Sequence, residues 1–120
     1  ARLGADEFVV AIHGSFDDDE MLEIAETIIE IVRHPIAYSG QNLQVGASIG
    51  ISYLSTENAT SIGEQINASD IALNEAKRDC GNSAVIFRPK MRDDIVANIE
   101  HAKDIQRGLN AKEFLPFFQP

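Results

Sequence analysis

Apolar and polar positions follow two different periods along the chain, and together they predict helices alternating with strands. Residues 8–12 (FVVAI) form a continuous apolar run that predicts a buried strand, fed by a hairpin turn at residues 4–7. Between residues 17 and 33 the apolar positions recur at helical spacing, which predicts an amphipathic helix that Pro35 ends. The apolar residues of that helix are Leu22, Ala25, Ile28, Ile29 and Val32.

Two acidic or hydroxyl residues are followed three positions later by glutamate, the spacing of a helix capping box. Asp17 with Glu20 opens the first helix, and Ser61 with Glu64 opens a second. The acidic run 17–20 could also hold a metal ion. The capping interpretation is favoured because the spacing suits a cap and acids in a first turn complement the helix dipole.

The middle of the chain reads as a hairpin, a strand, a helix and a short strand. Residues 36–44 predict the hairpin, with its turn at 39–41, and residues 45–54 predict the strand. Gly46 and Gly50 would weaken that strand, so we expect another backbone or helix to pack closely there. The helix that follows places Ile66, Ser69, Ala72, Leu73 and Ala76 inward, then a left-handed cap at Gly81 or Asn82 and a buried strand at 84–87.

The last third of the chain has a different character. Apolar residues at 91, 95, 99, 102, 105 and 109 predict an amphipathic helix roughly 30 Å long. We expect its apolar stripe to pack on its own domain, with a coiled-coil seam as the alternative. A further apolar strand begins at residues 114–118. Long helices over a mostly antiparallel sheet indicate an α+β fold.

Composition and charge argue against several kinds of function and location. The formal charge of −9 argues against nonspecific binding to nucleic acid. It does not exclude a nucleotide ligand, because a bound magnesium ion can invert the local charge. Cys80 has no internal disulfide partner, which favours a cytoplasmic setting, and the three histidines with this cysteine make no zinc spacing. No apolar run approaches the ~18 residues of a membrane span, although a parent protein could be anchored upstream.

The turn at residues 4–7 carries the candidate chemistry. Asp6 and Glu7 are adjacent carboxylates beside a tight turn, which suits a divalent cation and a phosphate substrate. The plainer alternative is a solvated turn that carries two charges.

Three segments match one family in the right order. RLGADEF (residues 2–8) resembles the signature of GGDEF domains, the diguanylate cyclase family. ASIGIS (47–52) resembles the family's SIGI strand, and ASDIALNEAK (68–77) resembles its AD-A-LY-AK helix. EFLPFFQP (113–120) is similar to the EF-L-YYQP opening of an EAL domain, the cyclic di-GMP phosphodiesterase module.

The resemblance implies a layout for the chain and its parent. Residues 1–89 would be the C-terminal half of a GGDEF domain, 90–112 a linker helix and 113–120 the first strand of an EAL domain. The implied fold is a ferredoxin-like sheet, as in the palm of nucleotidyl cyclases, incomplete at its N-terminus. We expect the unpaired edge of such a sheet to favour dimerisation or strand exchange.

The resemblance also implies site residues and partners. Asp6 and Glu7 would bind Mg²⁺, and Glu7 would also act catalytically at the attacking hydroxyl. Gly4, Ala5 and Lys77 would contact the nucleotide, GTP or cyclic di-GMP. Two domains must face each other in the family reaction, which implies a homodimer, beside the EAL domain and an N-terminal sensor domain.

Several departures from the family pattern predict a degenerate domain. Ala5 replaces the second glycine of the motif, where a primed turn would cost an alanine about 1 kcal/mol or more. The family's phosphate-binding arginine is missing from Cys80-Gly81-Asn82, and Asn74 replaces a tyrosine. We therefore expect a GTP- or metal-binding regulatory module that cannot make cyclic di-GMP by itself. The alternatives are an active cyclase in the intact parent and a purely structural dimerisation or docking module.

Overall fold

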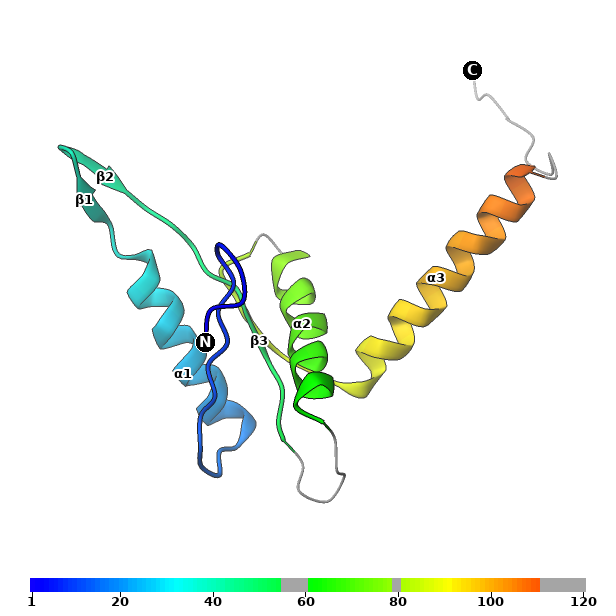
Figure 1. Cartoon of the computed structure of the whole chain (residues 1–120), viewed down its shortest axis with the longest axis horizontal. Helices are drawn as coiled ribbons and strands as arrows, with labels where there is room; N and C mark the ends of the chain where they lie inside the picture. The colour runs from blue at the N-terminus through cyan, green and yellow to red at the C-terminus, as the bar shows by residue number, and fades with distance from the viewer. Residues whose placement is uncertain (55–60, 79–80, 111–120) are drawn as a thin grey trace.

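The computed structural model describes residues 1–54, 61–78 and 81–110, which form a mixed α/β arrangement (Figure 1). In chain order the elements are α1 (Asp18–Arg33), β1 (Ile36–Tyr38), β2 (Gln41–Leu43), β3 (Ile49–Ile51), α2 (Ile62–Arg78), β4 (Ala84–Ile86) and α3 (Pro89–Asn110). The expected strand at 113–120 and Cys80 lie outside the described residues.

The centre of the fold is a parallel pair of strands, β3 and β4. Ile49 lies opposite Ala84 and Ile51 opposite Ile86. The sequence predicted a mostly antiparallel sheet, but this pair is parallel, because α2 connects the two strands and returns the chain to the same end before β4 begins. Helical crossovers of this kind join parallel strands. Between β1 and β2 the pairing is antiparallel, as expected.

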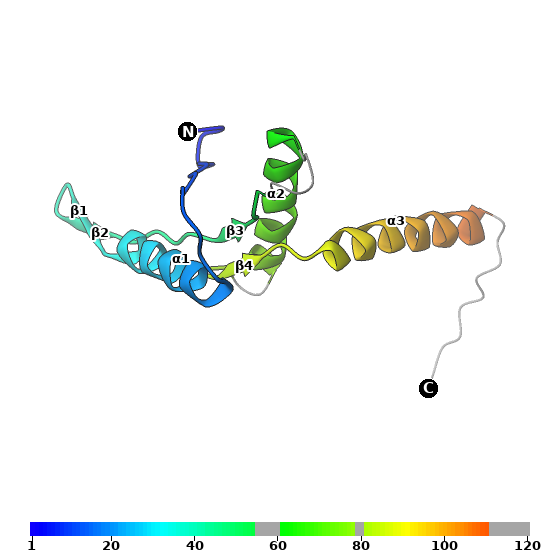
Figure 2. The same cartoon turned by 90° about the horizontal axis from the view of Figure 1, so that it is seen from below.

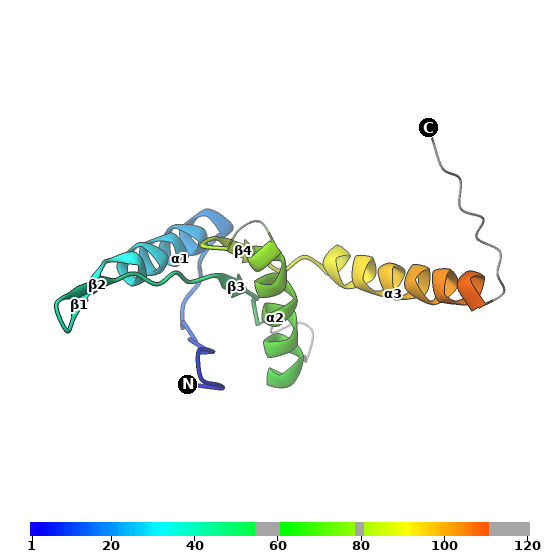
Figure 3. The ribbon, with the colours of Figure 1, turned by 90° about the horizontal axis from the view of Figure 1, so that it is seen from above.

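Helices α1 and α2 cover opposite faces of this pair. Ile51 and Ile86 are buried against Ala25 of α1, with Met21 and Leu22 packed around them. Adjacent strand residues point to opposite faces, so Gly50, between Ile49 and Ile51, faces α2. Figures 2 and 3 show α1 and α2 on either side of the strands.

Helix α2 approaches β3 very closely because the contact surface carries almost no side chains. Its buried residues Ala68, Ala72 and Ala76 lie one turn apart along one face. A side chain at Gly50 would place its Cβ only 2.0 Å from the carbonyl oxygen of Ser69 and 2.3 Å from the nitrogen of Leu73. The prediction of a close approach at Gly50 is confirmed. At Gly46 the close neighbour is the side chain of Asn82, 2.0 Å from a would-be Cβ.

The local signals read from the sequence are present in the structure. Asp17 and Glu20 form the predicted capping box, with both hydrogen bonds made. Ser61 and Glu64 form the second one, since the Ser61 N–H donates to Glu64 Oε2 at 2.8 Å and the Glu64 N–H to Ser61 Oγ at 3.2 Å.

The predicted hairpin turn and the predicted left-handed helix cap are also found. The β1–β2 turn has positive φ at Ser39 (48°) and Gly40 (78°), as a primed hairpin turn requires. Gly81 and Asn82, where the helix cap is expected, also have positive φ (69° and 55°).

The prediction of a buried strand at residues 8–12 is wrong. Phe8 is 68% and Val10 71% exposed, and the segment makes one isolated antiparallel bridge, between Arg2 and Phe8. Within the described residues no further strand lies beside this segment to pair with its backbone or cover its side chains. An apolar run becomes a buried strand only when such a neighbour is present.

The expectation that the α3 stripe packs on its own domain is also wrong for the described residues. Helix α3 leaves the β3–β4 layer and projects away from it (Figures 1–3). Half of the Ile99 side chain (50%) and 53% of Leu109 remain exposed. The helix contacts α2, and Arg92 lies over the ring of Phe87, 5.5 Å from its centre.

Replacing Gly50 by alanine should lower the free energy of unfolding by at least about 2 kcal/mol. The added methyl group would overlap the backbone of α2, and neither the strand nor the helix can move away without a cost in energy. Gly63→Ala is the matched control. A Cβ there meets nothing closer than Ser61 Oγ at 3.8 Å, so helix propensity should raise stability by about 0.5–1 kcal/mol. Urea denaturation measures both changes, and equal effects of the two substitutions would contradict the close packing.

Candidate functional site

The GADE turn at residues 4–7 closes a short antiparallel hairpin. The Leu3 N–H donates to the carbonyl of Glu7 at 2.8 Å, and the Gly4 N–H reaches the same oxygen at 3.3 Å. At the open end the Val9 N–H donates to the Ala1 carbonyl at 2.7 Å. The predicted turn is therefore present, although the strand it was expected to feed is not.

The side chain of Arg2, on the first arm of the hairpin, donates two hydrogen bonds to the turn. Its Nε donates to the Gly4 carbonyl at 2.9 Å and its Nη2 to the Ala5 carbonyl at 2.8 Å. The guanidinium also lies 5.8 Å from the centre of the Phe8 ring. Two parallel donors on successive carbonyls hold both peptide planes, a geometry that the planar fork of arginine can provide. Sequence reasoning missed this role, although the two partners lie only two and three residues away.

The predicted strain at Ala5 is absent. Among the described residues only Ser39 and Asn82 are non-glycine positions with positive φ, so Ala5 keeps an ordinary backbone conformation. Gly4 also lies outside the left-handed region. The loop uses three residues between Leu3 and Glu7 instead of a two-residue primed turn, and the alanine costs nothing in backbone energy.

Asp6 and Glu7, the candidate metal ligands, are both exposed. The carboxylate of Glu7 lies over the turn, since a side chain at Gly4 would meet Glu7 Oε2 at 3.4 Å. Across residues 1–54, 61–78 and 81–110 no group of three or more His, Cys, Asp or Glu residues could hold a metal ion. Two carboxylates suit Mg²⁺, which is commonly held by one or two carboxylates together with substrate phosphates and water.

Lys77, the candidate phosphate ligand, does not meet the turn. It is an exposed residue in the last turn of α2. Figure 2 shows the N-terminal hairpin well apart from the C-terminal end of α2. The structure therefore brings together Gly4, Ala5, Asp6 and Glu7, and leaves Lys77 outside this group.

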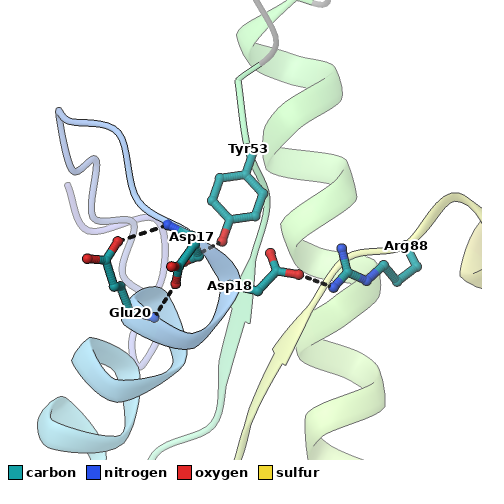
Figure 4. A network of polar contacts seen from close by, with 5 residues as sticks. All are labelled: Asp17, Asp18, Glu20, Tyr53 and Arg88. Atoms are coloured by element: carbon teal, nitrogen blue, oxygen red, sulfur yellow. Dashed lines mark hydrogen bonds and ion pairs between the residues drawn. The ribbon is translucent and has the colours of Figure 1, made fainter.

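A polar network connects the start of α1 with the residue that precedes α3 (Figure 4). Arg88 forms an ion pair and hydrogen bond with Asp18, seventy residues earlier in the chain. The hydroxyl of Tyr53, two residues after the end of β3, donates to the Asp17 carbonyl at 3.3 Å. No sequence signal joins positions so far apart, and this network could not have been predicted.

The ion pair shifts the titration of its members. The hydrogen bond from Arg88 holds the pKa of Asp18 below its ordinary value, and Asp18 raises the pKa of Arg88. Partial burial, followed by the neighbouring Asp18 carboxylate, raises the pKa of the Tyr53 phenol.

Comparison with known proteins decides the family. The sequence profile described as "Diguanylate cyclase, GGDEF domain" matches residues 1–83. The chain belongs to the GGDEF family. This membership connects it with cyclic di-GMP signalling, in agreement with the resemblance of its three motifs.

Two relatives are similar over almost the whole chain. An "uncharacterized signaling protein" of Caulobacter vibrioides is 33% identical over 121 residues, which cover 100% of this chain and 15% of that protein. The "uncharacterized protein y4lL" of Sinorhizobium fredii is 29% identical over 119 residues, 99% of this chain and 14% of that protein. The chain thus spans about one seventh of the length of these relatives.

Arg2→Met keeps the aliphatic stem and removes both donors to the turn. We expect the amide of Leu3 to exchange with solvent two- to fivefold faster, because one or two exposed hydrogen bonds are worth about 0.5–1 kcal/mol. Hydrogen exchange followed by NMR measures this rate. Arg78→Met, which removes an exposed ion pair with Glu75 in α2, should leave it unchanged.

Arg88→Gln should return the pKa of Asp18 towards its ordinary value of 3.8, because the main cause of its lowering is removed. A carboxyl whose folded pKa is lowered stabilises the fold above its unfolded pKa, and this contribution disappears as the pH falls through the folded pKa. The stability difference between the two proteins should therefore be present at pH 6 and vanish in acid. Carboxyl ¹³C titration and melting curves test this; a pH-independent difference would contradict it.

Proposed function

We propose that this chain is the C-terminal half of a degenerate GGDEF domain that binds GTP and Mg²⁺ weakly and does not form cyclic di-GMP by itself. The proposal rests on one observation. The signature turn presents two exposed carboxylates, Asp6 and Glu7, without a third ligand among the described residues and without Lys77 beside it. Such a turn can hold a cation that is already bound to phosphates, but it cannot surround one.

Each residue of the turn has a role in this proposal. Asp6 and Glu7 would hold Mg²⁺, which when bound neutralises the charge of the triphosphate. The unstrained backbone at Gly4 and Ala5 would face the nucleotide, with Arg2 keeping the loop in place. Glu7 would remain the residue closest to a reacting hydroxyl. Lys77 would contribute to phosphate binding only from a nucleotide that extends to α2.

An active cyclase in the intact parent is the second candidate, and the conformation of Ala5 favours it. The methyl group at position 5 imposes no left-handed strain on the turn. In that case Asp6 and Glu7 serve in catalysis as the resemblance implies, with the remaining ligands and the facing active site supplied by the rest of a homodimer.

The surrounding architecture is also part of the proposal. The palm-like, ferredoxin-related sheet would be completed by chain outside these residues. Residues 90–112, most of which lie in α3, would link the GGDEF domain to an EAL phosphodiesterase domain that starts at 113–120. A sensor domain would provide the input, in a cytoplasmic setting. Within the described residues no helix combines the length and apolar character that a membrane span requires. A module that only docks partners is the remaining alternative.

A titration of the 120-residue chain with GTP and Mg²⁺ tests the function. We expect amide shifts centred on residues 4–7, a dissociation constant on the order of 1 mM, and no cyclic di-GMP by chromatography. Asp6→Asn should weaken binding about tenfold, because it removes a charged ligand. Asp19→Asn, in the exposed first turn of α1, is the matched control.

The outcomes separate the candidates. Product formation by this chain would overturn the degenerate interpretation. If the shifts at residues 4–7 are absent, or are equally strong in Asp6→Asn, the chain is not a GTP-binding module and the docking alternative gains support.

A further inference from the structure

Helix α3 carries a row of exposed apolar side chains along one face. Its 22 residues carry a seam in which spacings of four and three alternate, at positions 91, 95, 98, 102, 105 and 109. Ile95 is 42%, Ile105 54% and Leu109 53% exposed, while only Met91, at the base, is partly covered. An alternation of four and three is the period of a coiled-coil seam.

We propose that this seam binds α3 of a second copy of the chain, with the two helices antiparallel. In the matching register Met91 lies against Leu109 of the second copy, and Ile95 against Ile105. Asn98 then lies against Ala102, so that the larger side chain fills the space beside the smaller one. Four of the six layers thus join two large apolar side chains, and the two Asn98–Ala102 layers join a larger side chain to a smaller one.

A parallel pair would pack less well. Each residue would meet its own copy, so Ala102 would face Ala102 and leave a gap. Beside the seam the antiparallel register places Arg92 near Gln106 and Ile99 near Ile99 of the second copy. The exposed Ile99 side chain (50%) is thereby covered as well.

The charge distribution also favours the antiparallel arrangement. Helix α3 has four basic residues (Lys90, Arg92, Lys103, Arg107) and four acidic residues (Asp93, Asp94, Glu100, Asp104), so it is neutral. The whole chain has a net charge of −9, which therefore lies outside α3. Antiparallel helices keep the two acidic bodies about 30 Å apart, well beyond the screening length of ~8 Å in physiological salt.

The same charge count argues against a membrane surface as the partner. Amphipathic helices that lie on anionic lipid have an excess of Lys and Arg on their polar face, and α3 has none. A neutral polar face beside a mostly apolar heptad seam fits another helix of the same kind better.

Sedimentation equilibrium of the 120-residue chain tests the association. We expect the mass to rise from 13.1 kDa towards twice that value at concentrations on the order of 100 µM. Ile95→Gln should weaken association at least tenfold. Val96→Gln is the matched control, because Val96 is adjacent and similarly exposed (52%) but lies outside the seam. A monomer at every concentration, or equal effects of the two substitutions, would overturn the proposal.

Cysteine cross-linking then tests the direction of the helices. In a Cys80→Ser background, a mixture of Met91→Cys and Leu109→Cys chains should form a disulfide between the two different variants on mild oxidation. Neither variant alone should cross-link to itself. Self-cross-linking of Met91→Cys chains would show a parallel pair and overturn the antiparallel assignment, and so would the absence of any cross-link in the mixture.

Discussion

The contact between Gly50 and the backbone of α2 is the constraint on which the fold depends. The described chain buries seven hydrophobic residues, four of which are alanines. Such small side chains contribute little buried apolar area, so the stability of this core depends on close contact between α2 and β3. Dispersion attraction falls steeply when even a small gap separates the two surfaces. By removing the side chain at position 50, the sequence lets α2 lie directly on β3. One face of the β3–β4 pair is thereby covered by α2, and α1 packs on the other face.

Local features were predictable from the sequence because their causes are local. The capping boxes of Asp17 and Ser61, the hairpin turn at 39–41 and the left-handed cap at Gly81 and Asn82 each depend on residues a few positions apart. The close approach at Gly50 was predictable from the glycine alone, although its partners lie in α2. The membership of the GGDEF family was predictable for the same reason, since its motifs are short and contiguous.

The failures concern relations between distant segments. Residues 8–12 have the composition of a buried strand, but burial needs a neighbouring strand that no local pattern supplies. The apolar stripe of α3 has the width of a packed helix face, yet the pattern does not say which surface covers it. The strain expected at Ala5 depended on an assumed two-residue turn, and the hydrogen bonds of Arg2 select a longer loop. Lys77 was grouped with the turn by resemblance alone.

The ion pair between Arg88 and Asp18 links two segments that are far apart in the sequence, and its strength depends on salt. Arg88 is the last residue before Pro89, where α3 begins. Its partner Asp18 is the first residue of α1 and comes ten residues after Phe8, whose bridge follows the GADE turn. Both side chains are about half exposed, at 56% and 43%, so salt screens their attraction. The ion pair that links the residue before α3 to the start of α1 is therefore weaker at high ionic strength.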